Sequence, residues 1–223
     1  MRRVIREYYE ELKKIDRETV VTVVYATVVL LFAMFMKRTN FLLPRDVFIE
    51  RLLVVGALYG VSPFLLYFAF RHAPRDYGLN LGEPKKWLVD VLVFYAIFLV
   101  ILYVAFRFTN LSKVYPLYRR ASHDAGSFLM YQIVQLWYML GWEFFFRGFM
   151  LFGLEPAFSR KSVLFQAMAF GLAHFKKPQA EAYGAVIAGV FLGLIALRSR
   201  SFLPCVLLHY MIVVTADLLG ILI

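Results

Sequence analysis

Long apolar runs, separated by short connections that carry most of the charged residues, divide this sequence. A helix needs about 20 mostly apolar residues to cross the hydrocarbon core of a bilayer, and several runs reach that length. The chain is 61% hydrophobic with a mean hydropathy of +0.67, too apolar for a soluble domain of 223 residues. We therefore predict an all-α integral membrane protein, a single bundle of about seven transmembrane helices at residues 20–36, 52–70, 87–108, 128–154, 162–175, 182–197 and 202–223.

The first 19 residues are basic and carry interspersed Tyr8, Tyr9 and Leu12. This composition is typical of an amphipathic helix that lies at the membrane interface on anionic headgroups. We divide the chain into this interfacial N-terminal helix, residues 1–19, and a polytopic membrane domain, residues 20–223. No Gly/Ser-rich linker or repeat interrupts the second part.

The net charge of +10 arises from basic residues in short connections rather than in one patch. This distribution predicts contact with anionic lipid headgroups and no nucleic-acid partner. Lysines and arginines are concentrated in the first segment and the next two connections, which favours a multi-pass protein of the cell membrane with a cytoplasmic N-terminus. The single cysteine, Cys205, excludes an intrachain disulfide.

Small residues repeat at every fourth position in two runs, which allows neighbouring helices to approach closely. Glu181 continues the second of these rows by one turn, so we expect it to face the protein interior. The rows are Gly56 and Gly60 in residues 52–70, and Ala185, Gly189 and Gly193 in residues 182–197.

Polar side chains form helical rows on three of the last four runs. Lipid penalises such groups, so each row is expected to face inward. Glu143 and Arg147 share one helix face and can partly neutralise each other, either as a structural ion pair or as a functional one. The rows are Gln135, Met139, Glu143 and Arg147; Gln166, Phe170 and His174; and Cys205, His209, Val213 and Asp217.

A glutamate and two histidines from three helices can hold a divalent metal ion and a water molecule. Imidazole nitrogens suit zinc, and a carboxylate can bind the metal or remove a proton from the water. Glu143, His174 and His209 are the candidate ligands. Each histidine also has an ordinary alternative as a hydrogen-bond partner between helices, and Cys205 as a small packing residue rather than a soft ligand.

These residues resemble the intramembrane proteases of the CAAX-prenyl protease and bacteriocin-processing family. That family has the motif EExxxR, then FxxxH, then HxxxN or HxxxD on later helices, and the similar core covers about residues 127–217. The matching residues are Glu143, Arg147 and Gly148 for the first motif, Phe170 and His174 for the second, and the stretch that leads to His209 for the third.

Two positions depart from these motifs. Trp142 stands where the family has its first glutamate, which is taken as the general base that activates water. Val213 stands where the family has a polar residue after the third-motif histidine. Glu181 and Asp217 are candidates for the displaced polar groups, because Asp217 lies one turn beyond Val213 on the same face.

We therefore predict a metal-dependent intramembrane peptidase, with zinc as the expected ion, that cuts a membrane-anchored protein or peptide near the bilayer surface. His174 and His209 would hold the metal or water, and Glu143 would act as base or ligand. Arg147 would fix Glu143 and offer positive charge to an oxyanion. Phe170, Glu181 and Asp217 are expected to support the site.

Two other functions are open at this stage. Trp142 and Val213 are consistent with a degenerate family member that confers peptide immunity, binds a partner or acts as a scaffold. A small transporter or channel would instead use the charged and imidazole side chains to line a polar path.

Overall fold

The computed structural model describes residues 5–6, 9–10, 13, 15–36, 46–69 and 73–223, and the regular structure in these ranges is helical. The predicted all-α class is confirmed. The long elements are α2 (Arg17–Phe35), α3 (Val47–Ala69), α4 (Pro84–Phe108), α5 (Ala125–Glu143), α6 (Leu151–Phe158), α7 (Ser162–Ala173), α8 (Gln179–Ser199) and α9 (Leu203–Leu222). The short ones are η1 (Pro74–Tyr77), η2 (Leu111–Lys113), η3 (Arg119–Ser122), η4 (Phe144–Met150) and η5 (Ser159–Lys161).

Five helices in the described ranges are long and apolar enough to cross a membrane: α2, α4, α8, α9 and Val47–Leu66 of α3. They correspond to five of the predicted spans, and the chain is a multi-pass membrane protein. The predicted spans 128–154 and 162–175 are helical but fall outside this set. With 12 residues, α7 is about 18 Å long, shorter than a bilayer core of about 30 Å. The count of seven spans stays a prediction.

The first long helix begins at Arg17, three residues before the predicted span. Asp16 accepts a hydrogen bond from the backbone N–H of Thr19 at 2.8 Å and so caps the helix. The same bond holds the pKa of Asp16 below its ordinary value. The interfacial helix predicted for residues 1–19 falls partly outside the described residues and stays a prediction.

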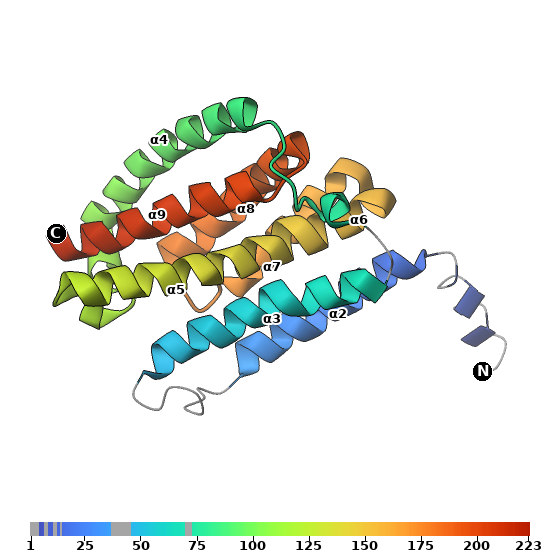
Figure 1. Cartoon of the computed structure of the whole chain (residues 1–223), viewed down its shortest axis with the longest axis horizontal. Coiled ribbons are helices and arrows are strands. Elements are labelled where there is room, and N and C mark those ends of the chain that lie inside the picture. Colours follow the sequence, from blue (N-terminus) through green and yellow to red (C-terminus); the bar gives the residue numbers. More distant parts are fainter. Residues whose placement is uncertain (1–4, 7–8, 11–12, 14, 37–45, 70–72) are drawn as a thin grey trace.

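Figure 1 shows the long helices side by side in an elongated bundle, with α5 between α3 and α9. α7 packs on α8, while α4 packs on α9 and α8 at the edge of the bundle. α5 contacts α9, and the continuation of α5 through η4 contacts α7 and α8. The three polar rows of the sequence therefore converge at the end of α5.

Facing glycines bring α3 and α5 into close contact. A Cβ on Gly141 would overlap the carbonyl oxygen of Gly56, and a Cβ on Gly60 would lie 3.2 Å from Cα of Gly141. The backbones would have to separate to admit any larger residue. The close approach predicted from Gly56 and Gly60 is confirmed, and it fixes the position of α5 in the bundle.

Candidate active site

The candidate site lies on a widened stretch of helix. α5 ends at Glu143 and continues as the π-helix η4, whose residues are all buried. Gly148 lets this stretch pack closely, because a Cβ there would lie 2.6 Å from the ring of Phe144 and 3.0 Å from the backbone oxygen of Tyr77. π-Helical turns within α-helices occur frequently at functional sites. This one directs the Glu143–Arg147 segment toward α7 and α9.

Glu143 and Arg147 form an ion pair in which both side chains are 0% exposed. Nη1 of Arg147 lies 3.1 Å from Oε1 and 3.0 Å from Oε2 of Glu143. The guanidinium also lies over the ring of Phe170, 3.9 Å from its centroid. The pair predicted from spacing is confirmed, and each buried charge has an opposite charge beside it.

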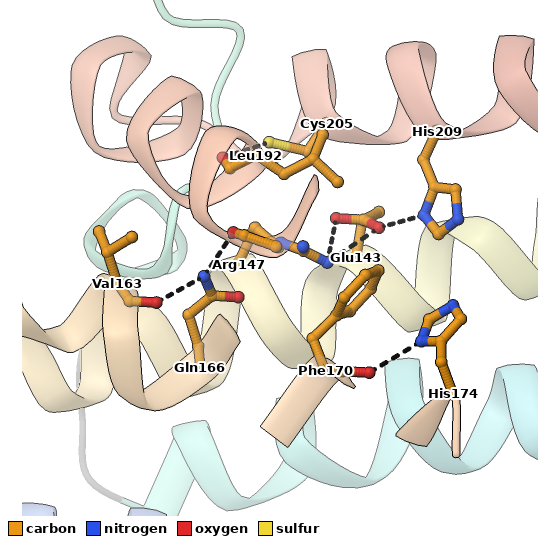
Figure 2. Close-up of polar contacts among 10 residues, drawn as sticks. Glu143, Arg147, Val163, Gln166, Phe170, His174, Leu192, Cys205 and His209 are labelled. Carbon is orange, nitrogen blue, oxygen red and sulfur yellow. Dashed lines mark hydrogen bonds and ion pairs between the residues drawn. The ribbon is translucent and has the colours of Figure 1, made fainter. Parts of the chain in front are cut away.

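His209 reaches the same carboxylate from α9. Its Nδ1 lies 2.6 Å from Oε1 of Glu143 (Figure 2). An ionised carboxylate only accepts hydrogen bonds, so Nδ1 donates and Nε2 is left with its lone pair. Figure 2 shows this second nitrogen on the ring edge turned away from Glu143. Glu143 therefore fixes both the orientation and the tautomer of His209.

His174 follows the last residue of α7, where its Nδ1 lies 2.8 Å from the carbonyl oxygen of Phe170. A carbonyl oxygen also only accepts, so Nε2 of His174 again keeps its lone pair. The ring of Phe170 contacts both imidazoles, with centroid distances of 4.5 Å to His174 and 5.8 Å to His209. Phe170 thus packs against His174, His209 and Arg147, and so joins the three motif segments.

Two cavities meet at His209. The first has a volume of about 260 Å³, and its α5 wall includes Gln135, Met139 and Trp142. The second, of about 150 Å³, is mainly apolar and is lined by residues of α4, α8 and α9. Both cavities are also lined by Tyr115, Glu181, His209 and Val213. A molecule in either cavity can therefore reach the histidine that Glu143 orients.

Glu181 lies in the first turn of α8 and faces both cavities, as predicted from its helical row. The Tyr115 hydroxyl donates to its Oε2 at 3.0 Å, and Nζ of Lys177 lies 3.1 Å from its Oε1. The carboxylate is therefore held near His209. Its role as a replacement for the family's first glutamate stays a prediction.

Asp217 and Cys205 have contacts of their own. The amide of Gln132 on α5 donates to Oδ2 of Asp217 at 3.0 Å, and Asp217 is 0% exposed. Sγ of Cys205 lies 3.1 Å from the carbonyl oxygen of Leu192 on α8. These contacts join α9 to α5 and α8, so Asp217 and Cys205 each have a role in helix packing.

The metal site predicted from Glu143, His174 and His209 stays a prediction. The part of the chain that the structure describes contains no group of three or more His, Cys, Asp or Glu side chains that could hold a metal ion. Glu143 already contacts Arg147 and His209, while the two histidines each keep a free Nε2. Hydrogen-bonded Nδ1 atoms are typical of metal-binding histidines, but a catalytic zinc site uses three protein ligands. The zinc ion stays a prediction.

Sequence reasoning did not single out Tyr115, and it noted Trp142 only as a departure. Tyr115 follows η2 in the connection between α4 and α5, where no helical row marks inward positions. Trp142 is one residue before the matching glutamate, and it lines the first cavity and contacts the His174 ring at 5.5 Å between centroids. The apolar character of Trp142 was visible in the sequence, but its place in the cavity wall was not.

Comparison with known families gives a match that covers this site. Residues 124–215 match the family described as "Type II CAAX prenyl endopeptidase Rce1-like". No curated protein and no solved structure matches the chain. The matched segment runs from the residue that caps α5 to α9 and contains Glu143, Arg147, His174 and His209. The part of the bundle that carries the candidate site, residues 124–215, is therefore similar to the Rce1-like family of type II CAAX prenyl endopeptidases.

Proposed function

We propose that this protein is an intramembrane peptidase in which His209, oriented by Glu143, activates the hydrolytic water. The observation that carries the proposal is the 2.6 Å contact between Nδ1 of His209 and Oε1 of Glu143 beside a cavity. A recurring arrangement in general-base catalysis is a histidine with one ring nitrogen hydrogen-bonded to a carboxylate and the other free to accept a proton. Arg147 keeps the carboxylate charged and in place.

The proposed reaction is hydrolysis of a peptide bond. Nε2 of His209 takes a proton from water, and the resulting hydroxide attacks the carbonyl carbon of the substrate. The C–N bond then breaks, and the proton on Nε2 passes to the leaving amine. Glu143 stabilises the imidazolium that exists between these two proton transfers, as a buried carboxylate does for other catalytic histidines.

The cavities favour a substrate that is itself anchored in the membrane. The first is walled mainly by apolar and aromatic side chains, including Tyr59, Tyr138 and Trp142, and the second is also mainly apolar. A membrane-anchored protein or peptide would enter them from the bilayer more readily than a soluble peptide. The matched family's description makes prenylated peptides the first probe to use.

Cleavage can be tested with the purified protein in proteoliposomes and a pool of farnesylated peptides. We expect mass spectrometry to detect truncated peptides with newly formed ends, accumulating linearly with time and enzyme. Addition of non-prenylated, membrane-anchored peptides to the pool tests whether the anchor must be a prenyl group. A pool that stays intact, with protein that is folded and correctly inserted, would contradict the proposal.

A divalent metal such as zinc is the alternative to this general-base role, because Nε2 of His209 cannot bind a metal ion and a proton at once. His174 and His209 would each contribute Nε2, and the ion would supply a Lewis acid for water or the carbonyl. We expect about one equivalent of zinc per wild-type chain and much less in folded His174→Ala and His209→Ala variants. Elemental analysis of the detergent-purified proteins measures this directly. Unchanged metal content in both variants would exclude these histidines as the ligands.

One observation favours a non-catalytic role instead. Trp142 fills the wall where a carboxylate would face His174, and it packs among Tyr59, Tyr138 and Phe146 at centroid distances of 5.0–5.4 Å. A protein that only binds a membrane peptide would keep this wall and would not need the Glu143–His209 contact. Peptide that binds and stays intact would support this second function.

A further inference from the structure

The α5 wall of the first cavity contains two buried polar atoms that lack hydrogen-bond partners among the described residues. They are Nε1 of Trp142, a donor, and Oε1 of Gln135, an acceptor. The two side chains are 6% and 3% exposed, and both line the cavity of about 260 Å³. Buried polar atoms in proteins usually have a hydrogen-bond partner, so each of these two needs an explanation.

The two atoms lie on one face of α5. Gln135 and Trp142 are seven positions apart, which is two helical turns and about 10 Å along the axis. Met139 and Tyr138 lie between them and line the same cavity. The wall therefore contains an amide side chain with an unpaired acceptor at one end, an indole with an unpaired donor at the other and mainly apolar side chains between them.

We infer that this wall binds the backbone of an extended peptide. Trp142 N–H would donate to a peptide carbonyl, and the Gln135 side-chain oxygen would accept from a peptide N–H. An extended chain advances about 3.4 Å per residue and turns the N–H and C=O of alternate residues to the same edge, so two such contacts would come from peptide residues about two or four apart. A lipid chain offers neither group, whereas a peptide backbone offers both at every residue.

The inference rests on the proposed function, because the bound peptide would be the substrate of the same site, and it names what holds that substrate. His209 lines the same cavity as Trp142 and Gln135. A peptide held along α5 would thus pass Nε2 of His209, the nitrogen that is not bonded to Glu143. Backbone recognition would select an extended conformation and tolerate many side chains.

Binding to a His209→Ala protein tests this without cleavage. The probe is a fluorescent pool of farnesylated ten-residue peptides, with anisotropy measured in nanodiscs. In this background Trp142→Phe removes the indole N–H but keeps an aromatic ring, and Gln135→Met removes the amide at similar size. Each should weaken binding about tenfold, which is the loss expected for one buried hydrogen bond.

Trp137→Phe is the matched control. Its indole nitrogen already donates to the carbonyl oxygen of Leu53 at 3.1 Å, and Trp137 is 41% exposed. This variant should bind the pool as tightly as its parent. A second pool with N-methylated backbones lacks peptide N–H donors, so Gln135→Met should no longer change its affinity.

The outcomes separate this inference from the proposed function. Equal affinity of the Trp142→Phe, Gln135→Met and Trp137→Phe proteins overturns the backbone contacts, as does the absence of any bound peptide. If either Trp142→Phe or Gln135→Met fails to fold, the affinity of the other variant tests the backbone contacts. In a further outcome, the affinity falls as expected in both variants while the protein with His209 intact leaves the peptide uncut. That result would support this inference and contradict the proposed hydrolysis.

Discussion

Replacement of Arg147 by methionine is expected to destabilise the protein by about 3–5 kcal/mol, because it leaves a buried charge uncompensated. Glu143 and Arg147 are both 0% exposed, and Nη1 lies 3.0–3.1 Å from the two carboxylate oxygens. The guanidinium also packs over Phe170, so its loss removes a contact as well as a charge. Thermal unfolding of the detergent-purified variant measures the change.

A double variant separates charge from packing. Glu143→Leu together with Arg147→Met removes both charges and keeps apolar volume, so it should recover most of the lost stability. Arg198→Met is the matched control, because Arg198 pairs with Asp90 at 3.0 Å while its side chain is 68% exposed. Breaking this pair, whose arginine is exposed to solvent, should cost about 1 kcal/mol. A single Arg147→Met variant as stable as this control would show that the buried pair does not hold the site together.

Replacement of His209 by alanine is expected to lower the cleavage rate by about 10²–10⁴-fold, the usual contribution of a general base. The stability should change far less than for Arg147→Met, because the Glu143–Arg147 pair remains and the His209 side chain is 13% exposed. Initial rates on one cleavable peptide, with melting temperatures alongside, distinguish the two effects.

His123→Ala is the control for this experiment. His123 is an exposed residue of the connection between η3 and α5, so its replacement should leave the rate unchanged. Equal rates for the His209→Ala and His123→Ala proteins would remove His209 from the chemistry. The reacting base would then have to be sought among the other groups of the cavities, with Glu181 first.

The helices could be predicted closely because apolar length and helical rows are local properties of the sequence. Their ends could not, since they depend on particular caps such as Asp16. The π-helix at residues 144–150 has no local signal either. It forms where Gly148 meets the ring of Phe144 and the backbone of Tyr77, and Tyr77 is distant in sequence.

The candidate site was predicted as a set of residues but not as a set of contacts. Helical spacing paired Glu143 with Arg147, because both lie on one helix. The contact between Glu143 and His209 joins two helices 66 positions apart, so only the packing of α5 on α9 could reveal it. Glu143 therefore contacts both Arg147 and His209, and its predicted role as a metal ligand stays a prediction.

Trp142 illustrates the same limit. As a sequence feature it is an apolar residue in place of the family's glutamate, which suggests lost activity. In the fold it forms part of a cavity wall that His209 shares, so the change alters the chemistry of the wall without closing the site. In the proposed mechanism, water is activated by His209, which Glu143 of the first motif orients.

The most direct test of the central claim is the origin of the oxygen at the new peptide end. The wild-type protein is incubated with the farnesylated peptide pool in ¹⁸O-labelled water, and products are analysed by mass spectrometry. We expect one ¹⁸O atom in each newly formed carboxyl terminus, and loss of this product in the His209→Ala protein. Peptides that remain intact with the wild-type protein, or labelled products formed equally by the His209→Ala protein, would contradict a His209-activated hydrolysis.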